Sequence, residues 1–252
     1  MSAPFRSGSF RRRLRVVVEA PDRVAAGIED DFHYFTVELR HDGRRVVAMD
    51  AASRRWPWST CPGAAEPLRA LAGMPLSPRC LAVGDWADPR QNCTHMFDLA
   101  GLAVAHAARG GAPGTTRQYD VAIPFGAQFG GRHDVRLWRD GDLLLTWTLD
   151  GRDCVAPPPY SEVRWRGGFL RWADEHLDAD AAEAAIVLRR ACDIGMGRGM
   201  DLDAVDSAEQ LLDTQGAICH TMQPGVVEVA LRNRGTIRDW DDDPDALLGA
   251  GP

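Results

Sequence analysis

Strand patterns precede helix patterns in each half of this 252-residue chain, and that order limits the fold more than any other feature. Alternating apolar residues flank Asp42-Gly43 and Asp140-Gly141, which is typical of β-hairpins. Helical periodicity follows in residues 93–111 of the first half and in residues 167–177 and 180–192 of the second. Strands grouped before helices favour an α+β fold, with antiparallel sheets and helices on one face, over alternating βαβ units.

The order of hairpin, helix and cysteine-histidine segment occurs twice. CTHM at residues 93–96 has a counterpart in CHTM at residues 219–222, and a linker rich in Gly and Thr separates the two halves. We therefore expect two α+β domains, residues 1–112 and residues 113–252. We interpret the second as a diverged repeat of the first, and the alternative is chance similarity.

All 29 basic residues are arginine, because the sequence contains no lysine. This excludes Schiff-base lysine chemistry, pyridoxal-phosphate enzymes and Walker-type loops, each of which needs a primary amine at a fixed position. The signatures GxSxG and HExxH are absent, which argues against the hydrolases and zincins that carry them. The glycine-rich residues 195–199 follow a helix rather than a strand, so we expect no nucleotide cofactor.

Charge and cysteine content predict a cytoplasmic protein that binds neither nucleic acid nor membrane. Six cysteines are too few for a disulfide scaffold, and no apolar stretch is long enough for a signal sequence or a membrane span. The net charge is −7. The arginine-rich residues 11–15 and the carboxylate-rich residues 239–245 are expected to be solvated termini.

The first candidate site opens the helix predicted at residues 93–111. Cys93 would face the positive end of the helix dipole, which lowers the pKa of a thiol. His95 and Asp98 are three residues apart, so the carboxylate can orient the imidazole. Cys93, His95 and Asp98 are therefore catalytic candidates, and the alternative is a polar cap on a core helix.

A second element is the aromatic segment in which Trp56 and Trp58 precede Cys61 and a short helix expected at residues 64–73. Two indoles that flank a proline form a stiff apolar wall suited to a substrate pocket. Trp56 and Trp58 are therefore substrate-binding candidates. In the alternative interpretation both are core residues, and Cys61 is a small buried hydrophobe.

His33 supplies a second imidazole, on the same face of a predicted strand as Phe35. His33, Cys61, Cys93 and His95 together offer two nitrogens and two sulfurs, which suits tetrahedral zinc or a ligated iron. These four residues are the predicted metal ligands, although their spacing lacks the paired CxxC knuckles typical of zinc sites.

The segments IEDDFHYFTVELR, PWSTCPGA and CTHMFDLA, in this order, resemble a bacterial family known as domain of unknown function 2889. The resemblance covers roughly residues 10–110 and implies that His33, Cys61, Cys93 and His95 fall on recurrent positions of the family. It implies no particular activity.

The layout of the first half is also similar to that of NifU-like iron–sulfur cluster scaffolds, with antiparallel strands, a cysteine loop, and a cysteine that opens an alanine-rich helix. The similarity implies that Cys61, Cys80 and Cys93 occupy the three cysteine positions of the scaffold. Gly63 and Asn92 stand where the scaffold has Asp and His, so the resemblance implies a shared fold with altered ligation.

From these features we expect an enzyme that acts on a small aromatic or acyl carboxylate by lyase-type or isomerase-type chemistry, through acid/base groups or a metal. Arginine is the available clamp for an anionic ligand. The alternative function is a metal or iron–sulfur carrier, or a non-catalytic binding protein. Domains of this kind can also pair, in which case the expected assembly is a homodimer.

Overall fold

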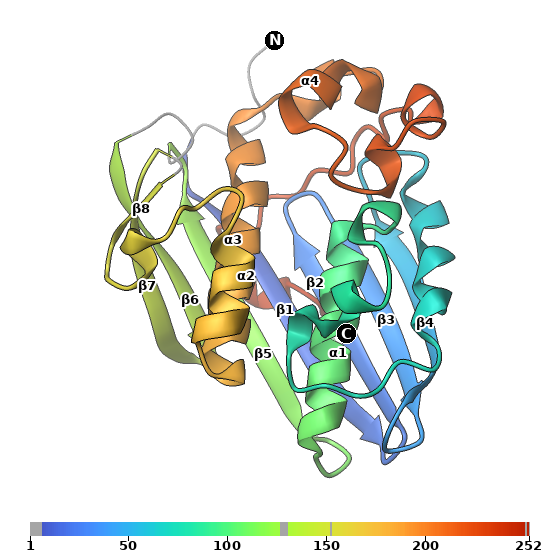
Figure 1. The fold of residues 1–252 in the computed structure, drawn as a ribbon. Helices are drawn as coiled ribbons and strands as arrows, with labels where there is room; N and C mark the ends of the chain where they lie inside the picture. Colours follow the sequence, from blue (N-terminus) through green and yellow to red (C-terminus); the bar gives the residue numbers. More distant parts are fainter. Residues whose placement is uncertain (1–6, 127–130, 152, 250, 252) are drawn as a thin grey trace. The chain divides into compact units, whose positions relative to one another are not determined.

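Eight strands form one sheet, in the order β4-β3-β2-β1-β5-β6-β7-β8, in the computed structural model, which describes residues 7–126, 131–151, 153–249 and 251 (Figure 1). Each pair whose register is described is antiparallel. The strands are β1 (Ser9–Ala20), β2 (Arg23–Asp30), β3 (Tyr34–His41), β4 (Val46–Arg55), β5 (Thr116–Pro124), β6 (Arg132–Arg139), β7 (Asp142–Asp150) and β8 (Asp153–Ala156). The helices are α1 (Thr94–Arg109), α2 (Phe169–His176), α3 (Ala179–Gly195) and α4 (Leu212–Gln215). The α+β prediction is confirmed.

The chain divides into two compact units, and each combines segments that are distant in the sequence. Unit 1 contains the chain up to Arg13, Gln118–Leu202 and Asp239–Leu247, whereas unit 2 contains Leu14–Arg117, Asp203–Arg238 and the chain from Leu248 onward. The predicted boundary lies between residues 112 and 113. In the structure the chain passes from unit 2 to unit 1 at Arg117, and it returns to unit 2 after Leu202.

In unit 2, helix α1 packs on β2 and β3 (Figure 1). Strand β3 alternates in burial, so that Phe35, Val37 and Leu39 are buried under the helix while the residues between them are more exposed. The helix ends at Gly110, whose φ of 69° suits glycine, as the sequence predicts. Its N-cap is Cys93.

The prediction of a single short helix at residues 64–73 is wrong. The structure instead has two 3-10 turns, Cys61–Ala65 and Pro67–Leu71, each with a proline in its first two positions. Pro67 has no N–H group to continue the hydrogen bonds of the first turn, so the segment divides there.

In unit 1, α3 packs on β6 and β7, and α2 packs on α3. The arginines at residues 11–15 belong to β1, and the prediction that they form a solvated terminus is wrong. Arg13 is 8% exposed and lies 2.6 Å from Asp120, while Arg11 lies 3.0 Å from Asp241. The carboxylates near the end of the chain thus pair with arginines of the same unit.

The two cysteine-histidine segments differ in structure. CTHM opens α1, whereas His220–Met222 of CHTM forms a single 3-10 turn. Both belong to unit 2, where the His220 amide donates to the Asn92 carbonyl at 2.9 Å. In the described part of the chain, no helix has both the length and the hydrophobicity that a membrane crossing requires.

Candidate metal centre

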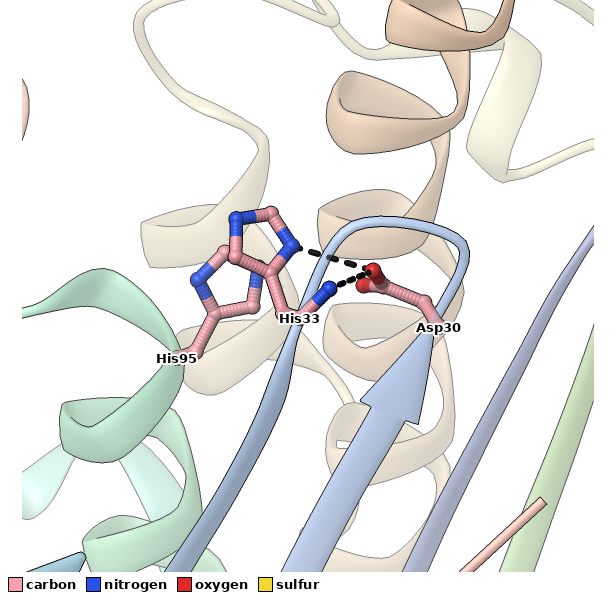
Figure 2. A group of neighbouring side chains, drawn as sticks. All are labelled: Asp30, His33 and His95. Carbon is pink, nitrogen blue, oxygen red and sulfur yellow. Dashed lines mark hydrogen bonds and ion pairs between the residues drawn. The ribbon is translucent and has the colours of Figure 1, made fainter. Parts of the chain in front are cut away.

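The tight connection between β2 and β3 holds an aspartate and a histidine together. The Oδ1 atom of Asp30 accepts hydrogen bonds from the backbone amides of Phe32 and His33, both at 2.8 Å, and lies 3.0 Å from Nδ1 of His33 (Figure 2). The Asp30 amide donates to the His33 carbonyl at 2.9 Å. With a proton on Nδ1, His33 donates to this carboxylate, and Nε2 is then the nitrogen that could hold an ion.

His95, in the first turn of α1, brings a second imidazole to this place. Its ring stacks on that of His33 with centroids 4.0 Å apart and planes 30° apart (Figure 2). The Phe35 ring lies 5.7 Å from the His95 ring, and both Phe35 and His95 are buried. Helix α1 packs on β3. His95, near the start of the helix, therefore meets His33, which directly precedes the strand.

One donor atom from each of Asp30, His33 and His95 can be chosen so that all three lie within 4.8 Å of one another. Ligand atoms bound to zinc at about 2.1 Å are about 3.0 to 3.4 Å apart when adjacent, whereas the 3.0 Å between Oδ1 of Asp30 and Nδ1 of His33 is the hydrogen-bonding contact described above. Two imidazoles and one carboxylate are also the donors of mononuclear iron sites. Asp30, His33 and His95 therefore offer donor atoms of the kind that zinc and iron bind.

Cys93 is a neighbour of this group. Its sulfur lies 3.9 Å from Nδ1 of His95. The expectation that the helix start makes Cys93 a thiolate is wrong, because burial raises its pKa well above the ordinary value and outweighs the hydrogen bonds from the amides of Met96 and His95. Cys93 is therefore a neutral thiol in the metal-free protein.

Cys61 lies in the 3-10 turn after β4, with its sulfur 3.7 Å from the Thr221 hydroxyl. Burial raises the pKa of Cys61 to about 11. Cys61, Cys93 and Cys219 all belong to unit 2, where the Cys61 sulfur contacts Thr221 and the Asn92 carbonyl accepts from the His220 amide. Within the described residues, none of the three joins a group of donor atoms as close as that of Asp30, His33 and His95.

Trp56 and Trp58 contact the returning C-terminal segment of unit 2. The Trp56 carbonyl accepts from the Asn233 side chain at 3.2 Å, and the Arg232 guanidinium lies 5.8 Å from the Trp58 ring centroid. Trp58 is 7% exposed. Their described contacts are with this segment rather than with the two histidines.

Asp98 lies one turn after His95 on α1 and is partly exposed. Asp30, which the sequence interpretation missed, contacts the imidazole of His33 in the candidate centre. Its signal is the spacing of Asp30 and His33, three residues apart at a strand end, where a short side chain can bond to the backbone amides that follow it.

Residues 16–109 match the model of a family described as "Protein of unknown function (DUF2889)". The matched segment includes Asp30, His33 and His95, together with Cys61 and Cys93. The cysteine-histidine turn that begins at Cys219 lies outside it. No curated protein matches the chain.

Proposed function

We propose that Asp30, His33 and His95 bind a zinc or iron ion, and that the protein is an enzyme that uses this centre on a small carboxylate substrate. The observation that carries the proposal is the convergence of two imidazoles and a carboxylate, from two segments of the chain, within 4.8 Å. The free state of all six cysteines supports a reducing compartment such as the cytoplasm.

A bound ion of this kind polarises a carbonyl or carboxylate oxygen. The residues of the chain have separate tasks. Asp30 holds His33 in one tautomer, and the His33 side chain is the most accessible of the three, at 12% exposed. With Nδ1 facing Asp30 and Nε2 holding the ion, His33 would serve as a ligand, and the proton that lyases and isomerases remove from carbon would go to another group. The absence of lysine leaves arginine as the residue that would bind the substrate anion.

A metal carrier is the second candidate function. The presence of Cys61, Cys93 and Cys219 in the same unit favours it, because thiols bind soft ions. The burial of Asp30 and His95 favours a resident ion over a transferred one, because an ion that is handed on needs accessible ligands.

The proposal predicts that His33→Ala and His95→Ala lose the bound metal. The measurement is the metal content of protein purified without oxygen and without chelators, before and after reconstitution with zinc or ferrous iron. About one ion per chain is expected in the original protein, and a content near zero in either variant.

The matched control is His176→Ala, because His176 is exposed on α2 and its metal content should be unchanged. An original protein that stays metal-free after reconstitution contradicts the proposal. An ion that survives both variants but is lost in Cys61→Ser supports the carrier instead.

A further inference from the structure

The guanidinium of Arg55, at the end of β4, holds the turn that carries Asp30 and His33. Its side chain is 10% exposed. Nη1 donates to the Asp31 carbonyl at 3.0 Å, and Nη2 donates to the His33 carbonyl at 3.1 Å and to the Asp30 carbonyl. Three carbonyls of one short turn thus share a single planar cation, so the backbone under both candidate ligands is fixed.

Glu29 connects this arrangement to the end of the chain. Its Oε1 accepts from Arg55 at 3.2 Å, and its Oε2 accepts from the Leu248 amide at 2.8 Å. Arg55 also donates to the Thr236 carbonyl at 2.9 Å, and the Arg238 amide donates to the Asp31 carbonyl at 2.8 Å. Thr236, Arg238 and Leu248, which lie outside the matched residues 16–109, therefore bond to the turn or to the side chains that hold it.

We propose that Arg55 is a positioning residue for the Asp30–His33 pair, and that it completes the metal centre only together with the C-terminal residues that bond to it and to Glu29. The inference rests on the proposed function for its metal, but the geometry of the turn is independent of the ion. Outer residues that orient metal ligands commonly control affinity, since each ligand must be presented in one orientation.

The test compares Arg55→Gln with Arg54→Gln in the full-length protein. Arg54 is the preceding residue on β4 and is exposed, so the two variants make the same chemical change at adjacent positions. Two properties are measured: the tautomer of His33 in metal-free protein, by NMR of the imidazole nitrogens, and the affinity for Zn²⁺, by competition with a chromophoric chelator.

Arg55→Gln is expected to lower Zn²⁺ affinity by about tenfold or more and to produce a mixture of His33 tautomers, while Arg54→Gln leaves both unchanged. A folded Arg55→Gln protein with the original tautomer and affinity overturns the inference. If the original protein binds no Zn²⁺ but Arg55→Gln still mixes the tautomers, the positioning role stands and the proposed function fails.

If Arg55→Gln does not fold, two milder variants, Arg55→Lys and Glu29→Gln, replace it in the test. Arg55→Lys retains the charge but not the planar fork, so the mixed tautomers and the weaker Zn²⁺ binding should persist. Glu29→Gln should give a smaller change in the same direction. Original behaviour in both folded variants overturns the inference.

Discussion

A single oxygen, Oδ1 of Asp30, accepts two backbone hydrogen bonds and contacts an imidazole nitrogen at a fully buried position. A buried carboxylate without partners is unfavourable by several kcal/mol, and these donors offset that cost. The same contacts that make the turn stable also fix the imidazole of His33. The hydrogen bonds to Oδ1 of Asp30 therefore both stabilise the turn and set the geometry of the proposed centre.

Two of the four predicted metal ligands, His33 and His95, lie in the structural group. The sequence pointed to them by residue type, because imidazole nitrogens are donors that zinc and iron bind. Asp30 could not be distinguished from Asp31 by composition, since both precede the same histidine and only the backbone path decides which one faces it. The burial of Cys61 and Cys93 depends on long-range packing, so their pKa values were not readable from helix position.

Cys61 is predicted to react slowly with alkylating agents at neutral pH, because burial raises its pKa to about 11. The neutral thiol stabilises the folded state fully below the unfolded pKa of about 9, and this contribution is lost as the pH rises through about 11. Mass spectrometry of iodoacetamide-treated protein should give a labelling rate at Cys61 that climbs steeply in alkali.

The control is the same reaction in denaturant, where Cys61 should label rapidly at mildly alkaline pH. Fast labelling of folded protein at neutral pH would mean that Cys61 is an activated thiolate, contrary to this account. Cys61→Ser should flatten the alkaline loss of stability.

At the scale of elements, local signals predicted the hairpins and the long helices. Asp140 and Gly141 both have positive φ, as their turn requires, and α3 follows the predicted pattern at residues 180–192. The segment at residues 64–73 was predicted wrongly because its apolar spacing is helical while Pro67 interrupts the hydrogen bonds. Local residue chemistry therefore determines these hairpins and helices, and it also explains why residues 64–73 do not form one helix.

Helix α1 approaches the turn at Cys80–Asp85 closely enough to require glycine at residue 101. A Cβ atom there would lie 2.1 Å from the Cys80 carbonyl oxygen. Gly101→Ala is therefore predicted to lower the free energy of unfolding by about 2 to 4 kcal/mol, because the obstacle is backbone. Urea denaturation measures the change.

Gly84→Ala is the matched control, because nothing lies within 4 Å of a Cβ at that position and its φ is not positive. Its free energy of unfolding should change by less than about 1 kcal/mol. Equal effects of the two substitutions would contradict the packing of α1 on this turn.

At the scale of the whole molecule, the chain returns to unit 2 after Leu202 and brings Thr221 to Cys61 and His220 to Asn92. The repeat of hairpin, helix and cysteine-histidine segment did not predict this return. Long-range pairing of this kind leaves little local signal, because the bonded residues are far apart in the chain, as for Ser59 and Leu231 at a separation of 172 residues.

Arg232 anchors the returning segment. It donates to the Pro57 carbonyl at 2.8 Å and lies 2.7 Å from the Asp203 carboxylate, with its own side chain 1% exposed. Arg232→Ala is predicted to lower the free energy of unfolding by about 2 to 4 kcal/mol, because it removes a buried cation and leaves its partners without a donor. Thermal or urea denaturation provides the measurement.

Arg234→Ala is the comparison, since Arg234 pairs with Asp206 at an exposed position. The expected loss is below about 1 kcal/mol. A loss for Arg234→Ala as large as that for Arg232→Ala would indicate that the buried anchor has no special role.

The most direct test of the metal centre is a crystal of the reconstituted protein measured at the absorption edge of the added ion. The account predicts an anomalous peak about 2 Å from a nitrogen of His33 and of His95 and from a carboxylate oxygen of Asp30. A fully occupied peak bound only by Cys61, Cys93 and Cys219, or no peak in protein that contains these residues intact, would contradict it.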